Sequence, residues 1–317
     1  MRVCKEFSYI LYREEEQQFK QYMGNNFIPF QDLIDATTFV ITNTDPFLDF
    51  PRPIISKVLD LGGLGVKVPL PLNEEWKKIL EKRSKAVFIS FGSIAKSYTM
   101  PMNVKKTFAA TFKRFPDVTF IWKYETEDTD FLREIENVHT SPWCPQNDIL
   151  NHPNLKIFVT HGGMNSVLET AHRGVPAIVV PLFADQMRNA KMMERVGSAI
   201  ELSRFDLQNV DKLSGAIEEL LNNEKYATTA ERVSTMIENR PHDLKNTFIK
   251  HIEFAARFGS VSTMTSLAPR TSFIIYFMLD AIILALCLIF VFSVVVYAGY
   301  RGVRRLFCDP KKKFKTT

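Results

Sequence analysis

The chain has 317 residues, of which 46% are hydrophobic and 24% are charged, so one α/β domain with additional segments can bury a sizeable core. The formal net charge of +5 is misleading as an average, because residues 301–317 hold seven basic residues against Asp309 alone. The remainder of the chain, residues 1–300, is close to neutral and gives no electrostatic reason to bind nucleic acid. The scattered cysteines have neither disulfide nor zinc-ligand spacing. They are Cys4, Cys144, Cys287 and Cys308.

The first fifty residues carry the least information. Met1–Ile10 has neither a long apolar core nor a small-residue cleavage site, so we do not identify it as a signal peptide. Arg13–Met23 is compatible with a helix. Thr38–Thr42 predicts a strand that ends at the turn Asn43–Pro46. The proline- and glycine-rich stretch Phe50–Leu72 is typical of a linker between domains.

Strands and helices then alternate along the chain, which predicts an α/β fold with a doubly wound parallel sheet. The expected strands are Ala86–Phe91, Val118–Trp122, Ile157–Thr160, Ala177–Val180 and Ala199–Leu202. The expected helices are Glu74–Arg83, Asn103–Phe115, Asn165–Arg173, Asp185–Val196, Leu207–Leu221, Glu224–Glu238 and Asp243–Phe258.

The stretch Trp143–Gln186 has the order of a β-α-β crossover, with the turn His161-Gly162-Gly163 between its first strand and its helix. This places the turn at the carboxyl end of a parallel strand, where open α/β sheets bind ligands. Two residues without a Cβ let the backbone approach phosphate oxygens, and the helix start favours an anion. The turn therefore predicts a diphosphate site.

Side chains around this turn suit the other parts of a nucleotide sugar. His161, Asn165 and Ser166 can donate to the diphosphate, and Glu169 lies one turn beyond on the same helix face, where it can face ribose hydroxyls. Upstream, Trp143 offers a flat face to a base.

The remaining candidates flank this group in the sequence. Gln146 offers an amide to the base, and Asp185 with Gln186 offers groups suited to sugar hydroxyls. Ser93, in the turn after an earlier strand, is either a donor contact or a helix cap. Trp143 could instead be a packed aromatic, and His161 a structural turn residue.

The patterns W-x-P-Q, H-G-G, N-S-x-x-E and P-x-x-x-D-Q, with FPRP at residues 50–53 and FISFGS at 88–93, resemble the UDP-glycosyltransferases, most closely the animal UDP-glucuronosyltransferases. The resemblance runs from about Thr38 onward. It implies the carboxyl-terminal, Rossmann-like half of the two-domain GT-B architecture. It also implies transfer from a UDP-sugar, with UDP-glucuronic acid expected and UDP-glucose the alternative, to a small lipophilic acceptor.

The resemblance also implies a division of the chain and of the site. Residues 1–50 correspond to the end of an amino-terminal acceptor domain, 51–85 to a linker and first helix, and 86–258 to the donor domain. The expected donor residues are Ser93, Trp143, Gln146, His161, Gly163, Asn165, Ser166, Glu169, Asp185 and Gln186. No cofactor or metal is implied beyond the UDP-sugar as donor substrate.

The family's catalytic base is a histidine of the amino-terminal domain, most of which is missing here, so we assign no catalytic base. We therefore expect no transfer by this chain alone. The alternative is a non-catalytic membrane subunit that binds UDP-sugar, or that pairs with itself or a related chain and regulates it.

The last segment predicts a single membrane helix over Phe273–Tyr297, interrupted by Asp280 near one end. The basic residues of 298–317 favour a cytosolic tail, and their dilysine-type ending resembles a retrieval signal of the endoplasmic reticulum. The globular part would then be lumenal only if a longer product supplies a signal peptide. Just past the span, Cys308 is either palmitoylated or an ordinary free thiol.

Overall fold

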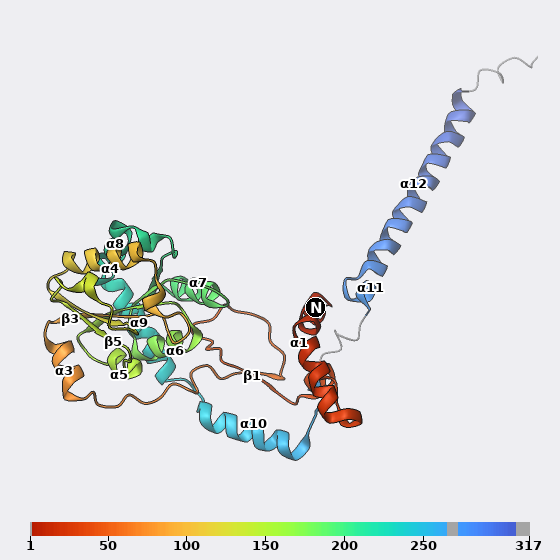
Figure 1. Cartoon of the computed structure of the whole chain (residues 1–317). Coiled ribbons are helices and arrows are strands. Elements are labelled where there is room, and N and C mark those ends of the chain that lie inside the picture. The colour runs from red at the N-terminus through yellow and green to blue at the C-terminus, as the bar shows by residue number, and fades with distance from the viewer. Residues whose placement is uncertain (1, 265–271, 309–317) are drawn as a thin grey trace, which may run out of the picture. The chain divides into compact units, whose positions relative to one another are not determined.

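In the computed structural model of the chain, residues 2–264 and 272–308 are described. They divide into two compact units, Thr38–Ser260 and the two chain ends Met1–Thr37 and Val261–Thr317 (Figure 1). Each unit is described by itself.

A six-stranded sheet forms the centre of the Thr38–Ser260 unit. Its strands are β3 (Lys85–Ser90), β4 (Val118–Lys123), β5 (Val138–Ser141), β6 (Leu155–Thr160), β7 (Ala177–Val179) and β8 (Ala199–Glu201). Their order is β5-β4-β3-β6-β7-β8, and every neighbouring pair is parallel. This is the doubly wound topology predicted from the alternation of strands and helices, so the expected fold class is confirmed.

Side chains alternate between the two faces of the sheet, and both faces are buried. In β3, Val87 and Ile89 enter one hydrophobic cluster, whereas Ala86 and Phe88 enter another on the opposite face. Strands buried on both faces are apolar almost throughout, which explains why these runs show no polar alternation in the sequence.

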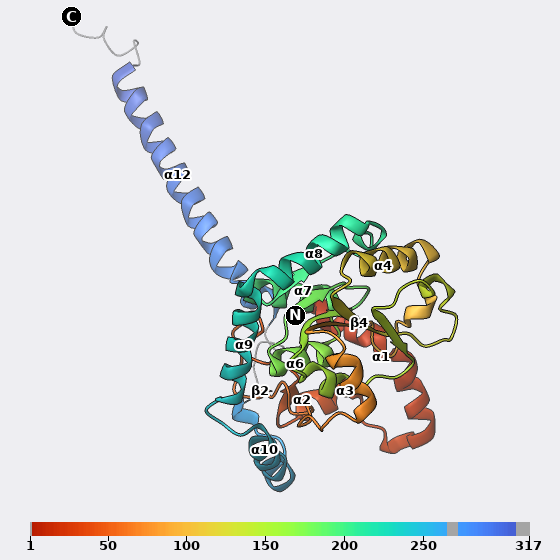
Figure 2. The ribbon, with the colours of Figure 1, turned by 90° about the vertical axis from the view of Figure 1, so that its left-hand side faces the viewer.

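Helices cover each face of the sheet (Figure 2). The first face is covered by α4 (Met102–Arg114) and α8 (Val210–Asn222). The other is covered by α3 (Glu74–Glu81), α5 (Gln146–Leu150), α6 (Met164–Arg173), α7 (Gln186–Val196) and α9 (Glu224–Glu238). The short α5 lies where the sequence indicated only a loop.

The strand order reverses between β3 and β6, and this reversal places the candidate site. The chain leaves β3 toward β4 and β5 on one side, and it leaves β6 toward β7 and β8 on the other. The turns that follow the two central strands diverge and leave a crevice at their carboxyl ends, where ligands of such sheets bind.

A second, two-stranded sheet belongs to the same unit. β1 (Val40–Thr42) pairs in parallel with β2 (Val58–Asp60), which lies inside the stretch that composition indicated to be a linker. Residues 43–66 are therefore held in place by the pairing of β1 with β2 and by the ion pairs of Asp45, Asp49 and Asp60. α10 (Leu244–Phe258) contacts the residue just before β1, since the ring of Phe39 lies 4.8 Å from that of His251.

The unit made of the two chain ends is helical. α1 spans Arg2–Met23, well beyond the helix expected from Arg13, and α2 spans Phe30–Ala36. The expectation of one uninterrupted helix from Phe273 was wrong. α11 ends at Tyr276, and the chain passes through Met278, whose φ is +52°, before α12 begins at Leu279.

The long helix α12 (Leu279–Cys308) contains most of the apolar segment Phe273–Tyr297 predicted from the sequence. Leu279–Arg305 is 27 residues long, and its most apolar 18-residue stretch has a mean hydropathy of 3.0, so the helix is long and apolar enough to cross a membrane. The last part of the basic tail, residues 309–317, lies outside the described residues.

Candidate functional site

The glycine turn after β6 has a backbone that other residues cannot adopt without strain. Gly162 has a φ of +81°, and a Cβ on it would lie 2.7 Å from Cγ1 of Val179. A Cβ on Gly163 would lie 2.5 Å from Nε2 of His161, and one on Gly92, in the turn after β3, would lie 2.8 Å from Cε1 of the same ring. The imidazole of His161 thus fills the space between the two central turns.

The environment of His161 keeps its ring neutral. Burial is the main cause that lowers its pKa, the nearby Lys123 adds to the effect, and Asp185 opposes it. Its Nδ1 is buried without a hydrogen-bond partner among the described residues. A neutral imidazole in this place can donate its one N–H to an incoming anion.

Lys123, at the end of β4, is a site residue that the sequence did not reveal. Its amine donates to the carbonyl of Gly92 at 2.6 Å and lies 3.8 Å from the carboxylate of Glu125. It lies close enough to affect the pKa of His161. The sequence does not show which strands are neighbours, so it could not place Lys123 beside the turn that follows β3. In the structure, β4 is the neighbour of β3.

Three predicted residues from two helices are joined by hydrogen bonds. Gln146, the first residue of α5, donates through Nε2 to Oγ of Ser166 at 3.1 Å and to the carboxylate of Glu169. Ser166 and Glu169 are one turn apart on α6, as the spacing predicts. Ser166 is buried, so its hydroxyl supports Gln146 rather than facing the crevice openly.

Trp143 lies on the loop after β5 with its ring largely uncovered, at 67% exposure. The loop is anchored on both sides of it. The carbonyl of Trp143 accepts from Oγ of Ser141 at 2.6 Å, and Cys144 is buried in the core, where burial raises the pKa of its thiol to about 12. A firmly held loop that exposes a tryptophan face is suited to stacking on a flat ligand.

The two residues at the start of α7 have different surroundings. Gln186 is buried, and its Oε1 accepts from the backbone N–H groups of Leu182 and Phe183 at 2.8 and 3.1 Å, so this oxygen shapes the loop before the helix. Asp185 is exposed and accepts from Nδ2 of Asn189 at 2.9 Å.

Asn189 links Asp185 to the glycine turn. Its buried Nδ2 also donates to the carbonyl of Gly162 at 2.9 Å. The sequence did not single out this residue, because its place becomes meaningful only when α7 is packed against the turn.

Asn165, at the start of α6, and Ser93, after β3, are both exposed. Oδ1 of Asn165 accepts from Nδ2 of Asn43 at 3.3 Å. Asn165 and Glu169 also line a cavity of about 150 Å³. The remaining lining residues are Asn43, Gly63, Gly65, Val66 and Leu168.

The geometry brings the predicted residues to the carboxyl ends of β3, β5, β6 and β7, around the reversal point of the sheet. A comparison with protein families agrees with this architecture. The model of the family described as "UDP-glucoronosyl and UDP-glucosyl transferase" matches residues 2–314. The chain belongs to this family of UDP-glycosyltransferases.

Named relatives include proteins from a nematode and an insect. "Putative UDP-glucuronosyltransferase ugt-48" of Caenorhabditis elegans is 32% identical over 272 residues, which cover 84% of this chain and 52% of that protein. "UDP-glucosyltransferase 2" of Dactylopius coccus is 30% identical over 83% of this chain and 50% of its own length. The chain spans about half the length of the curated relatives it matches.

Solved structures confirm the fold. The glycotransferase of kitacinnamycin superposes with a TM-score of 0.57 at 20% identity, over 76% of this chain and 60% of that one. The spinosyn forosaminyltransferase SpnP superposes with a TM-score of 0.54 at 20% identity, over 68% and 54%. The expected GT-B relationship therefore holds for this UDP-glycosyltransferase.

Proposed function

We propose that this chain binds the sugar donor of a glycosyl transfer, with UDP-glucuronic acid as the donor and a small lipophilic molecule as the acceptor. The observation that carries the proposal is the convergence of Trp143, the Gln146–Glu169 pair and the His161-Gly162-Gly163 turn at the reversal point of the sheet. These groups match, in order, a base, a ribose and a diphosphate.

In the proposed complex the uracil stacks on Trp143, and the amide of Gln146 lies beside it. Glu169 accepts from ribose hydroxyls, because its carboxylate is already oriented by Gln146. The diphosphate meets the first amides of α6, with His161, Gly163 and Asn165 around it. The buried Ser166 contributes through the hydrogen bond that it accepts from Gln146.

The sugar then lies toward Asp185, Gln186 and Ser93. Of these, Asp185 and Ser93 are exposed and can face the sugar, whereas Gln186 contributes mainly through the loop that it orders. Lys123 adds a positive charge beside His161, which favours the anionic donor.

The proposed chemistry is displacement at the anomeric carbon. The acceptor oxygen forms a bond to that carbon, the bond to the diphosphate oxygen breaks, and its electron pair leaves with UDP. Fixed donors at the start of α6 stabilise the charge that develops on the departing diphosphate, and they need no reorganisation when it forms. The acceptor's proton passes to a base that we do not assign to this chain.

The choice of sugar is part of the proposal, because the relatives' names include both glucuronosyl and glucosyl donors. We further propose that α12 anchors the protein in the endoplasmic reticulum membrane, with the basic residues that follow it in the cytosol. Arg301, Arg304 and Arg305 at the end of α12 support this orientation.

Calorimetry tests the donor proposal. The full chain in detergent micelles is titrated with UDP, UDP-glucuronic acid, UDP-glucose and, as a control nucleotide, ADP. We expect binding of UDP and tighter binding of UDP-glucuronic acid than of UDP-glucose. Glu169→Gln should weaken UDP binding by about 1–3 kcal/mol, because a charge-assisted hydrogen bond is lost.

The exposed residue Glu134 provides the matched control, since Glu134→Gln should leave the affinity for UDP unchanged. Equal binding of ADP and UDP would contradict the base site. Unchanged UDP affinity in a folded Glu169→Gln variant would contradict the ribose site.

A further inference from the structure

A buried ion pair joins two distant parts of the Thr38–Ser260 unit. Arg240 follows α9, and Asp45 lies between β1 and β2. The guanidinium Nη2 donates to the carboxylate at 2.8 Å, and the two side chains are only 10% and 0% exposed. Charges held away from water persist only where their geometry and further hydrogen bonds compensate for lost hydration. The pair therefore fixes the segment that carries Asp45.

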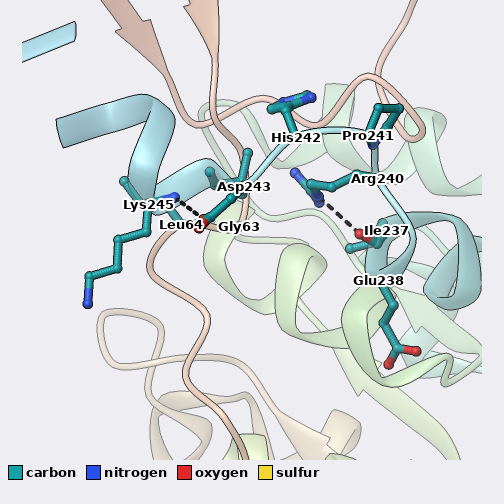
Figure 3. Close-up of a pocket in the computed structure, with 10 residues that line it drawn as sticks. Gly63, Leu64, Ile237, Glu238, Arg240, Pro241, His242, Asp243 and Lys245 are labelled. Atoms are coloured by element: carbon teal, nitrogen blue, oxygen red, sulfur yellow. Dashed lines mark hydrogen bonds between the residues drawn. The ribbon is translucent and has the colours of Figure 1, made fainter. Parts of the chain in front are cut away.

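Further bonds extend this attachment to the glycine loop after β2. Nε of Arg240 donates to the carbonyl of Ile237 at 3.0 Å (Figure 3), and Nη1 lies 3.5 Å from the carbonyl of Gly62. The N–H of Gly62 donates to the carbonyl of Thr44 at 2.8 Å, and a Cβ on Gly62 would lie 2.3 Å from the backbone of Thr44. Residues 43–45 and the glycine loop are thus locked to each other.

Asn43 lies at the end of this locked segment, next to the candidate site. Its Oδ1 accepts from the N–H of Gly63 at 3.4 Å, and its Nδ2 donates to Oδ1 of Asn165 at 3.3 Å. Asn43 lines the same 150 Å³ cavity as Glu169. A residue from outside the six-stranded sheet therefore shares a cavity with the carboxylate proposed for the ribose.

We propose that Asn43 is a further binding residue for a ribose hydroxyl of the donor, and that the Asp45–Arg240 pair positions it. The inference rests on the proposed function. An ionised carboxylate such as Glu169 can only accept hydrogen bonds. A hydroxyl in the cavity can donate a hydrogen bond to Glu169 and accept one from Nδ2 of Asn43, because that amide nitrogen carries two hydrogens and only one of them is used on Asn165.

The first test compares nucleotides that differ by one hydroxyl. The full chain in detergent micelles is titrated with UDP, 2′-deoxy-UDP and 3′-deoxy-UDP. Asn43→Ala should weaken UDP binding about three- to tenfold, the effect of one hydrogen bond, and should leave binding of one of the two deoxy analogues unchanged. Asn103→Ala, at an exposed asparagine of α4, should change none of the affinities.

The outcomes separate the two proposals. If the unaltered protein binds no UDP, the proposed function fails. If it binds UDP and the Asn43→Ala variant binds it equally well, the role of Asn43 is overturned. If the variant loses affinity equally for all three nucleotides, the assignment to a ribose hydroxyl is overturned.

The second test asks whether Asp45 acts through Asn43. Asp45→Asn should weaken UDP binding in the native background and cause no further loss in the Asn43→Ala background, since coupled residues are not additive. A loss of the same size in both backgrounds would overturn the positioning role.

Thermal unfolding shows whether each variant is folded. If Asp45→Asn is not, the double change Asp45→Leu with Arg240→Met removes the ion pair without leaving an unpaired charge, and the same comparison is made with it.

Discussion

The helix α6 and the segment 43–66 line one cavity, but they reach it by different means. α6 begins directly after a central strand, and a glycine turn that allows a φ of +81° sets its direction. The segment 43–66 lies outside the six-stranded sheet, and it is held by the Asp45–Arg240 pair and by Asp49 with Arg52 and Arg188. Local chain geometry positions one wall, and contacts between distant residues position the other.

The largest effect is expected from breaking the buried ion pair. Asp45→Ala leaves the guanidinium of Arg240 buried without its partner, so the free energy of unfolding should fall by about 3–5 kcal/mol. Urea denaturation followed by circular dichroism measures it. Asp130→Ala, which removes an exposed ion pair with Arg133, is the control and should cost less than about 1 kcal/mol. Equal effects would mean that segment 43–66 is not held by the pair.

A pH effect should come from His172, at the end of α6 beside this segment. Burial, followed by the charge of Arg240, lowers the pKa of His172 to about 4, while Asp45 opposes the shift and Arg173 adds to it. The folded protein therefore keeps the ring neutral where the unfolded chain, with a pKa near 6.5, binds a proton. This contribution is complete above about pH 6.5 and is lost as the pH falls toward 4.

The resulting loss of stability between pH 7 and pH 5 should be about 2 kcal/mol. Urea titrations at the two pH values measure it, and His172→Asn should remove most of the difference. His242→Asn, at an exposed histidine, should leave the difference as it is. A pH dependence that persists in His172→Asn would show that another group is responsible.

Trp143 belongs to the part of the site that local chain geometry positions. Trp143→Ala should reduce the affinity for UDP rather than the stability of the fold. The ring is 67% exposed, so its removal leaves the core intact, whereas a lost stack on the uracil should cost about 1–3 kcal/mol of UDP binding. Calorimetry and thermal unfolding measure the two quantities. Trp76→Ala, at a buried tryptophan, should show the reverse pattern. A stability loss in Trp143→Ala without an affinity loss would indicate a packing role.

The smallest effect is expected at the outer ion pairs of segment 43–66. The side chain of Arg52 is 35% exposed and lies 2.8 Å from both Asp49 and Asp60. Asp49 keeps its bond to Arg188 when Arg52 is lost. Arg52→Ala should therefore lower the free energy of unfolding by no more than about 1 kcal/mol, as a urea titration can show. A loss as large as that of Asp45→Ala would place the main attachment of the segment here instead.

The fold could be predicted well because its signals are local. Apolar β-branched runs mark β3, β6 and β7, and helical spacing marks α4 and α9, whose bounds agree with the prediction within about two residues. β2 was missed because Val58–Asp60 is short and lies among prolines and glycines. The break before α12 was missed because residues 277 and 278 are as apolar as their neighbours, so composition gives no sign of it.

The sequence by itself determined the alternation of strands and helices, and the glycine turn that starts α6. It also determined the side chains offered around that turn, because each depends on residues that are close along the chain. Only the tertiary structure decided that Lys123 bonds to the turn after β3 and Asn189 to the turn after β6, and that Gln186 shapes its own loop. It alone also placed Asn43 in the same cavity lining as Glu169. These facts depend on strand order and on a buried ion pair between residues 45 and 240, which no local pattern in the chain encodes.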